Sequence, residues 1–423
     1  MKSPSLSSDK LYCYKKEKWF NLGRSLAPLM LFSLGVSTLL GFFILYSPNP
    51  FKSAPKHGLD WKKTLVQPQN DDENCDLSKG HWVPDLNGSL YTNLSCATIP
   101  DSKNCFKNGR RDKDFVNWRW KPEHCELPQF DPTTFLKIVK GKKLAFIGDS
   151  VARNHMESLL CLLSKEEIPR EIHKDSEDRF VTWHFSYHDF TLMILWSKFL
   201  VIGEERVING SKSGVFDLDL DTVDSKWSQN LSDVDYAIIS DAHWFFRKVY
   251  LNEGGNITGC VYCTEPNVTD LGLGFAIRMS FRAALNYINN CKECKVTLTL
   301  LRTFSPAHFE GGAWDTGGSC NRTSPQREGE VKLVGHELEL RKIQVEEIER
   351  IKEKGKKRGK RFDVMDVTRA MLMRSDGHPG SNWGNKWMKG YNDCVHWCLP
   401  GPIDAWNDFL MAILRKEAGL SLD

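Results

Sequence analysis

The chain has 423 residues, of which 41% are hydrophobic and 26% are charged, and its net charge at pH 7 is +3. This length allows one large or two ordinary domains with a sizeable core, and the near balance of charge argues against nucleic acid as a partner, because nucleic acid needs a concentrated basic face. Trp and Cys are unusually frequent, with 14 and 13 residues; indole rings either stack on sugar rings in a carbohydrate cleft or fill a core.

Residues 26–46 form a run of apolar and small residues without a charge, long enough to span a bilayer. The basic residues before this run are Lys2, Lys10, Lys15, Lys16, Lys18 and Arg24. Because a basic flank stays in the cytosol, we expect a cytosolic tail over residues 1–25 and a single-pass type II signal anchor over residues 26–46. The rest of the chain would then lie in the lumen. A cleaved signal peptide is the alternative interpretation.

Two features after the apolar run agree with a lumenal location. Twelve of the 13 cysteines follow it, and in an oxidising compartment we expect most of them to form disulfides, whereas Cys13 should be a free thiol. Asn-x-Ser/Thr sequons for N-glycosylation follow the run and none precedes it. The sequon residues are Asn87, Asn93, Asn209, Asn230, Asn256, Asn267 and Asn321.

The texture of the sequence changes twice before the main domain begins. Residues 47–74 carry prolines and charges without apolar periodicity, which is typical of a stem. Residues 75–128 combine cysteines, turn residues and tryptophans, and this composition predicts a small loop-rich module held by disulfides.

From residue 129 to residue 423 the chain alternates between strand-like and helix-like segments. The expected strands are 143–148, 235–240, 295–301 and 362–367. The expected helices are 151–164, 274–289, 336–354 and 402–416. Such alternation predicts an α/β domain in which helices cover both faces of a mainly parallel sheet.

The first chemically informative segment is Gly148-Asp149-Ser150, where a buried strand ends and a helix begins. Such a turn lifts the serine hydroxyl above the sheet edge, and it aims the first amides of the helix at the group that the serine attacks. Those amides and the helix dipole can stabilise the oxyanion of an ester intermediate. An ordinary N-cap serine is the alternative.

The second segment contains Asp393 and His396. A serine nucleophile needs a base, and histidine exchanges protons near neutral pH. The base needs a carboxylate that fixes its tautomer. Because the two residues are three positions apart, one helical turn would place them side by side; an ordinary surface turn is the alternative. The C-terminal loops of an α/β sheet can approach the end of its first strand, so the two segments can form one Ser150–His396–Asp393 triad.

These segments resemble the trichome birefringence-like family of plant polysaccharide O-acetyltransferases, whose catalytic domain is similar to the GDSL/SGNH esterases. The resemblance extends from about Cys75 to the last helix. Its motifs are Cys75-Asp-Leu-x-x-Gly-His-Trp-Val-Pro84, Trp118-Arg-Trp-Lys-Pro122, the serine turn and Asp393-Cys-Val-His-Trp-Cys-Leu-Pro-Gly401. The segments around Ser150 and Asp393 look most similar to the xyloglucan members.

The resemblance implies a double displacement, in which Ser150 accepts an acetyl group and a sugar hydroxyl then takes it. His396 would act as base and then acid, and Asp393 would orient it. Arg153 matches a family position beside the nucleophile, where it could support the oxyanion, hold Asp149 or form a surface ion pair. His378 matches a second family histidine near the cleft.

The resemblance also implies a Golgi membrane protein whose catalytic domain faces the lumen and whose substrate is a neutral cell-wall polysaccharide, most similar to xyloglucan. It suggests disulfides that join Cys75 to Cys125 and Cys96 to Cys161. No dinucleotide or phosphate loop is present, so no bound cofactor is expected. The acetyl donor is either acetyl-CoA or an acetylated intermediate.

Two Cys-x-x-Cys pairs, at Cys260 and Cys291, have the spacing of a zinc site, but we expect disulfides and no metal in the lumen. Aromatic residues crowd the second segment, and some could form a stacking floor beside the triad, with core packing as the alternative: Trp383, Trp387, Tyr391 and Trp397. An acetylesterase of the same fold and a carbohydrate-binding protein with an idle triad remain rival functions.

Overall fold

Strand β3, Lys143–Gly148, lies in the middle of the largest sheet, and its side chains alternate between two cores. The computed structural model describes residues 75–385, 388 and 390–421. Leu144 and Phe146 join the core on one face of the sheet, whereas Ala145 and Ile147 join the core on the other. Successive residues of a strand face opposite sides, so a strand that is covered on both faces is apolar throughout.

The main sheet has the strand order β13-β12-β9-β3-β6-β5-β4. The strands from β13 to β6 are parallel, and β5 and β4 extend one edge in antiparallel register. The bounds are β4 Arg170–Lys174, β5 Phe180–Phe185, β6 Phe190–Trp196, β9 Tyr236–Ser240, β12 Leu298–Arg302 and β13 Arg361–Met365. The predicted mainly parallel sheet is confirmed, and the antiparallel edge is an addition to it.

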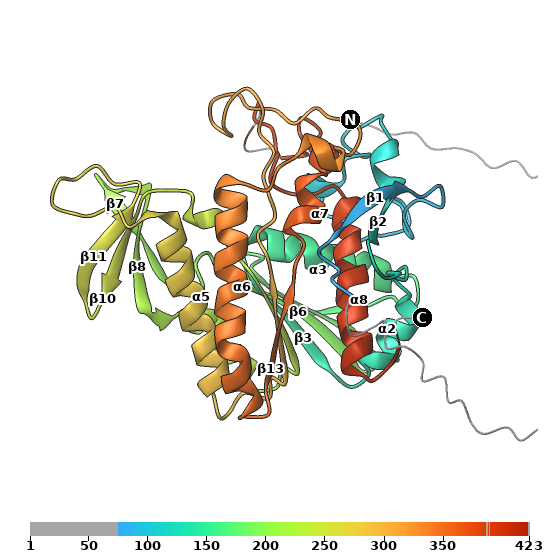
Figure 1. The fold of residues 1–423 in the computed structure, drawn as a ribbon, viewed down its shortest axis with the longest axis horizontal. Helices are drawn as coiled ribbons and strands as arrows, with labels where there is room; N and C mark the ends of the chain where they lie inside the picture. Colours follow the sequence, from blue (N-terminus) through green and yellow to red (C-terminus); the bar gives the residue numbers. More distant parts are fainter. Residues whose placement is uncertain (1–74, 386–387, 389, 422–423) are drawn as a thin grey trace, which may run out of the picture. The chain divides into compact units, whose positions relative to one another are not determined.

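Helices cover both faces of this sheet (Figure 1). On one side lie α2 (Pro132–Ile138), α3 (Ser150–Leu163) and α8 (Ala405–Glu417), and on the other lie α5 (Gly272–Asn290) and α6 (Gly335–Lys356). The four predicted helices correspond to α3, α5, α6 and α8, although a 3-10 turn over Pro402–Asp404 precedes α8. The short helices are α4 (Ser225–Ser228) and α7 (Thr368–Leu372).

A second sheet, which the sequence analysis did not predict, packs beside α5 (Figure 1). Its order is β11-β10-β8-β7. The strands are β7 Val201–Ile208, β8 Ser211–Val223, β10 Val249–Glu253 and β11 Asn256–Val261. Phe216, Leu218 and Leu251 face the core shared with the main sheet. The other face of this sheet carries many charged residues. Because they interrupt the apolar runs, the sequence pattern does not indicate these strands.

The cysteine-rich segment before α2 contains a two-stranded sheet of β1 (Gly80–Pro84) and β2 (Trp118–Pro122). Trp82 and Trp120 pack edge to face across it, with ring centroids 5.7 Å apart. The Trp82 indole also donates a hydrogen bond of 2.8 Å to the carbonyl oxygen of Ala370. The segment therefore packs directly on the α/β domain.

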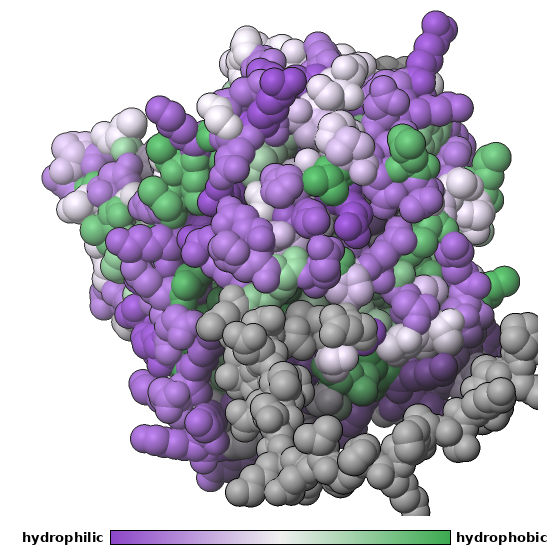
Figure 2. Space-filling model, turned by 45° about the vertical axis from the view of Figure 1, so that its right-hand side comes forward, coloured by the Kyte–Doolittle hydropathy of each residue, from purple (hydrophilic) through white to green (hydrophobic). Residues whose placement is uncertain are grey.

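The surface is largely hydrophilic on the face shown in Figure 2. Six of the seven sequon asparagines are exposed and Asn93 is half-buried, so the positions suit attached glycans. The predicted tail, anchor and stem, residues 1–25, 26–46 and 47–74, lie outside the described residues. Within residues 75–385 and 390–421, no helix is both long enough and apolar enough to cross a membrane.

Candidate active site

The turn between β3 and α3 requires glycine at position 148. Gly148 has a φ of 143°, a value that residues with a side chain rarely adopt. A Cβ atom there would lie 1.9 Å from the carbonyl oxygen of Ser240 on the neighbouring strand β9. The close approach lets α3 begin immediately at Ser150, which places the serine hydroxyl at the carboxyl end of the central strands, where α/β proteins form their sites.

Asp149 is the N-cap of α3 and is fully buried. One carboxylate oxygen accepts from the amides of Val151 at 2.8 Å and Ala152 at 3.4 Å. Burial alone would raise the pKa of this carboxyl, but the hydrogen bond and charge of His243 and the charge of Arg302 lower it to about 2. The expectation that the first helix amides serve the oxyanion is therefore wrong for Val151 and Ala152, because Asp149 occupies them.

Ser150, His396 and Asp393 are hydrogen-bonded in series. The Ser150 hydroxyl lies 2.8 Å from Nε2 of His396, and Nδ1 of His396 lies 2.8 Å from a carboxylate oxygen of Asp393. Burial alone would raise the pKa of the Asp393 carboxyl, but the charge and hydrogen bonds of His396 hold it well below its usual range. An ionised Asp393 keeps the Nδ1 hydrogen on His396, so Nε2 can accept the serine proton.

The segment that carries the pair is a turn, not a helix. The second carboxylate oxygen of Asp393 accepts from the amides of Val395 at 3.1 Å and His396 at 2.9 Å. The main chain of Asp393 also pairs with Gly380 through two hydrogen bonds. The residues that were predicted from the spacing do come together, but the predicted helical turn is wrong: side-chain capping of a turn holds them instead.

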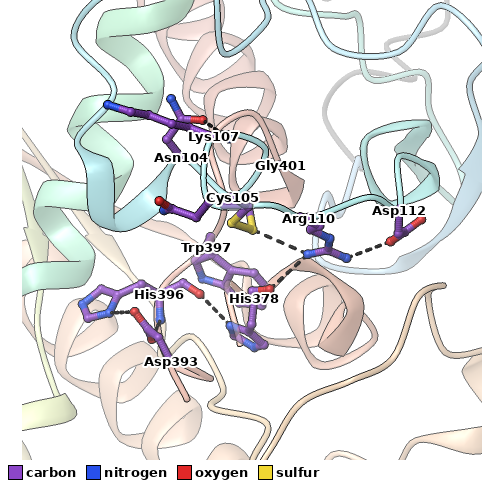
Figure 3. The surroundings of a disulfide bond; sticks show 12 residues. Asn104, Cys105, Lys107, Arg110, Asp112, His378, Asp393, His396, Trp397 and Gly401 are labelled. Carbon is purple, nitrogen blue, oxygen red and sulfur yellow. Dashed lines mark hydrogen bonds and ion pairs between the residues drawn. A yellow bond between two sulfur atoms is a disulfide. The ribbon is translucent and has the colours of Figure 1, made fainter. Parts of the chain in front are cut away.

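Disulfides fix this turn on both sides of His396. Cys394 is joined to Cys320, and Cys398 is joined to Cys105 of the cysteine-rich segment. Figure 3 shows the second of these bonds beside Arg110, whose guanidinium donates to the carbonyl oxygens of His378 at 3.0 Å and Asp376 at 2.6 Å. The cysteine-rich segment thus holds in place the turn that carries the catalytic base, His396.

His378 supports the turn from within the core. Its ring stacks on Trp397 with centroids 4.0 Å apart, and its Nδ1 lies 2.7 Å from the carbonyl oxygen of His396 (Figure 3). Nε2 of His378 lies 2.7 Å from Nδ1 of His308, whose Nε2 is 3.1 Å from the carbonyl oxygen of Leu372. His378 is buried and does not line the cleft at Ser150.

His308 and His378 together carry fewer ring hydrogens than their three hydrogen-bond contacts require. The chain from Leu372 through His308 and His378 to His396 has carbonyl acceptors at both ends, so its three contacts need three hydrogens. Two neutral imidazoles supply only two. Burial lowers the pKa of His308 to about 4 and lowers that of His378 well below its usual range. At neutral pH the pair is therefore neutral, and one of the three contacts lacks a hydrogen.

Arg153 lies beside Ser150 in the cleft but is directed at the β4–β5 turn. Its guanidinium donates to the carbonyl oxygen of Asp178 and lies 3.5 Å from the Asp178 carboxylate. Of the three roles that the sequence left open for Arg153, the structure shows the ion pair.

The triad lines a cleft of about 610 Å³. Trp383 lines it, whereas Tyr391 is exposed outside it and packs against Trp314. Trp387 lies outside the described residues. Trp397 has no exposed surface and donates to the Ser305 hydroxyl at 3.0 Å. The prediction of a stacking floor is therefore wrong for Trp397, because a buried ring cannot meet a sugar.

Part of the cleft lining, which we call the cationic wall, was not predicted. It carries Trp196 and Lys198 at the end of β6, and Trp244 and Arg247 after β9. In the sequence, only the position of these residues indicates a site. Each pair lies at or just after the end of a strand of the main sheet, where side chains reach the carboxyl edge. An isolated lysine or arginine in a loop otherwise indicates only a solvated surface.

Every cysteine in the described residues is in a disulfide. The expected pairs Cys75–Cys125 and Cys96–Cys161 are both present. Each Cys-x-x-Cys motif closes on itself, as Cys260–Cys263 and Cys291–Cys294. Across residues 75–385 and 390–421, no cluster of His, Cys, Asp or Glu could hold a metal ion. The oxidised cysteines agree with a chain that folds in an oxidising compartment.

Fold and site together define a serine acyl-transfer protein of the GDSL/SGNH type. The family described as "GDSL/SGNH-like Acyl-Esterase family found in Pmr5 and Cas1p" matches residues 127–413, and the "PMR5 N terminal Domain" matches residues 73–126. The chain belongs to the trichome birefringence-like family.

Its relatives include proteins named for an activity. The chain is 61% identical to Xyloglucan O-acetyltransferase 4 of Populus trichocarpa over 98% of both chains. It is 56% identical to xyloglucan O-acetyltransferase 2 of Arabidopsis thaliana, over 95% of this chain and 96% of that protein. Protein trichome birefringence-like 19 of Arabidopsis thaliana is 45% identical over 82% of each chain.

Proposed function

We propose that this protein is a polysaccharide O-acetyltransferase that acts on xyloglucan. The observation that carries the proposal is the series Ser150–His396–Asp393, with hydrogen bonds of 2.8 Å, in an open cleft. The names of the relatives with 56% and 61% identity supply the reaction and the polysaccharide. Side-chain sugars of xyloglucan are the proposed acceptors.

The geometry supports a double displacement. In the first half-reaction, Nε2 of His396 takes the hydroxyl proton of Ser150, the serine oxygen bonds to the acetyl carbon, and the donor leaves with that proton. In the second, His396 takes the proton of a sugar hydroxyl, the sugar oxygen attacks the acetyl-serine, and the proton returns to Ser150. Asp393 stabilises the imidazolium in both steps.

A water molecule in place of the sugar hydroxyl would make the protein an acetylesterase. The decisive experiment incubates the purified full-length chain with deacetylated xyloglucan and an acetyl donor, and identifies the products by mass spectrometry. We expect acetylated xyloglucan, and none with a Ser150→Ala variant. Release of acetate with no acetylated glycan would favour the esterase, and absence of both products would favour a carbohydrate-binding protein.

We propose further that the protein is a glycosylated Golgi membrane protein with a type II anchor at residues 26–46 and its α/β domain in the lumen. The disulfides and the exposed sequons support this location. Protease treatment of sealed microsomes should spare the chain after Tyr46, and an endoglycosidase should reduce its mass by several glycans. Digestion of the α/β domain from outside would contradict the proposed topology.

A further inference from the structure

Two cations on the wall of the cleft have no carboxylate partner among the described residues. The ammonium nitrogen of Lys198 lies 4.7 Å from the ring centroid of Trp244, and the guanidinium carbon of Arg247 lies 4.1 Å from it. Lys198 also lies 4.5 Å from the Phe216 ring. Both cations line the cleft that contains Ser150. They share an aromatic support and face the same space.

This arrangement costs stability. Burial lowers the pKa of Lys198, and repulsion from Arg179, Lys212 and Arg247 lowers it further, against the attraction of Glu205. Burial also lowers the pKa of Arg247, against the attraction of Glu205, and its Nε is buried without a hydrogen-bond partner among the described residues. Desolvated cations that lack a partner are unfavourable, and contact with a ring offsets only part of that cost.

The nearby carboxylates have other partners. Glu177 lies 2.9 Å from Arg179, and Asp178 pairs with Arg153. Glu205 accepts from the amide of Gly214 at 3.0 Å and lies 3.9 Å from Lys212. The wall therefore keeps an excess of positive charge, and a bound anion would neutralise that excess.

The anion follows from the proposed function, on which this inference rests. Xyloglucan is a neutral glycan and gives these cations nothing to bind, so the negative charge must belong to the donor. Arginine and lysine together suit phosphate groups, and Trp196 packs edge to face with Trp244 at 5.8 Å, which offers aromatic surface beside them. We propose that Lys198, Arg247 and Trp244 form the subsite for the phosphate groups of a phosphorylated acetyl thioester of the acetyl-CoA class.

The chemistry balances with such a donor. The Ser150 oxygen forms a bond to the acetyl carbon as the carbon–sulfur bond breaks. The serine proton passes through His396 to the departing thiolate, so the products are acetyl-serine and the free thiol of the carrier. Neither Lys198 nor Arg247 takes part in these bond changes; they hold the phosphate end of the donor.

The test compares a charged donor with an uncharged one. The purified full-length chain is assayed for transfer to xyloglucan from acetyl-CoA, for hydrolysis of p-nitrophenyl acetate, and for CoA binding by calorimetry. The variant Lys198→Gln with Arg247→Gln should raise the KM for acetyl-CoA and weaken CoA binding, each by about tenfold or more. Hydrolysis of p-nitrophenyl acetate should change by less than about twofold, because that ester has no phosphate.

Lys248→Gln is the matched control. Lys248 also lies over an aromatic ring, 5.5 Å from the centroid of Tyr250, but it pairs with Glu265 at 2.5 Å and does not line the cleft. It should leave CoA binding unchanged.

Three results would overturn the subsite. The first is an unchanged KM and CoA affinity in the double variant, and the second is an equal loss with p-nitrophenyl acetate. The third is calorimetric binding of oligogalacturonate without any binding of CoA, which would indicate an acidic glycan. If the protein transfers nothing to xyloglucan but binds CoA through Lys198 and Arg247, the subsite stands and the proposed function fails. If transfer occurs and the variants bind CoA normally, the subsite alone fails.

Discussion

Nδ1 of His378 lies 2.7 Å from the main-chain carbonyl oxygen of His396, so one buried histidine holds the backbone of another whose ring faces the cleft. His378 touches neither Ser150 nor the cleft surface. The sequence placed it among the candidate cleft residues, and the structure makes it a positioning residue. Its effect on the reaction passes through the orientation of the His396 ring.

The variant His378→Phe should keep the stacking on Trp397 but lose both hydrogen bonds of the ring. We expect kcat to fall roughly 10- to 100-fold with little change in KM, because small displacements of a catalytic base have effects of this size. His378→Asn, which can still donate to the His396 carbonyl, should recover part of the loss. An unchanged kcat in a folded His378→Phe protein would contradict the positioning role.

The Cys105–Cys398 disulfide should contribute more to stability and to kcat than the short-range disulfide Cys291–Cys294. It closes a separation of 293 residues, whereas Cys291–Cys294 closes a separation of 3. Replacing both Cys105 and Cys398 by Ser should lower the free energy of unfolding by roughly 4–5 kcal/mol and lower kcat, since His396 lies two residues from Cys398. The paired replacement of Cys291 and Cys294 should cost roughly 2 kcal/mol and spare kcat. Denaturant unfolding and steady-state assays measure both; equal effects would contradict the argument.

Substitution of Trp383 and of Trp397 by alanine should distinguish a residue of the cleft from a residue of the core. Trp383→Ala should leave thermal stability nearly unchanged, lower transfer to xyloglucan at least about tenfold, and affect hydrolysis of a small acetyl ester much less. Trp397→Ala should instead lower the free energy of unfolding by about 3–5 kcal/mol. Thermal unfolding and the two assays, run side by side, decide the case. Equal destabilisation by both substitutions would remove Trp383 from the proposed glycan surface.

His155 makes the fold sensitive to acid. Its buried ring lies between Phe146 and Trp406, and burial, followed by the charge of Arg302, lowers its pKa to about 3. The unfolded chain takes up a proton near pH 6.5, but the folded chain does so only near the lower value, so stability falls as pH drops from about 6.5 toward 3.

Between pH 7 and pH 5, this difference amounts to about 2 kcal/mol. His155→Phe should remove that part of the pH dependence, as measured by urea unfolding at the two pH values. His124→Phe, at a residue whose side chain is 78% exposed, is the control. The same slope in His155→Phe as in the unmodified chain would show that another group is responsible.

Local patterns were sufficient to predict much of the fold. Apolar runs located β3, β9 and β12 because each is buried on both faces, and the periodicity of α3 and α5 located those helices. The edge strand β13 is buried only in part, and its alternating Phe362 and Val364 located it. The second sheet was missed because its strands are buried on one face only and carry charges such as Glu204 and Asp217 on the other.

The site was predictable only where its residues are close in sequence or fixed in type. Gly148 and Ser150 carry a recognisable turn, and Asp393 and His396 share one short segment. Lys198 and Arg247 follow two different strands that the fold brings to one cleft wall, so no local pattern joins them. The disulfide between Cys105 and Cys398 likewise joins residues that are 293 positions apart in the sequence.

In the proposed mechanism, the acetyl group passes through Ser150 to a glycan. The most direct measurement mixes the full-length chain with an acetyl donor, quenches the reaction before and after addition of deacetylated xyloglucan, and maps acetylation by peptide mass spectrometry. We predict an acetyl group on the peptide that contains Ser150, lost on addition of the glycan as acetylated xyloglucan appears. Acetylated xyloglucan formed without any acetyl-Ser150, or an acetyl-Ser150 that decays to acetate at the same rate with and without glycan, would contradict the account.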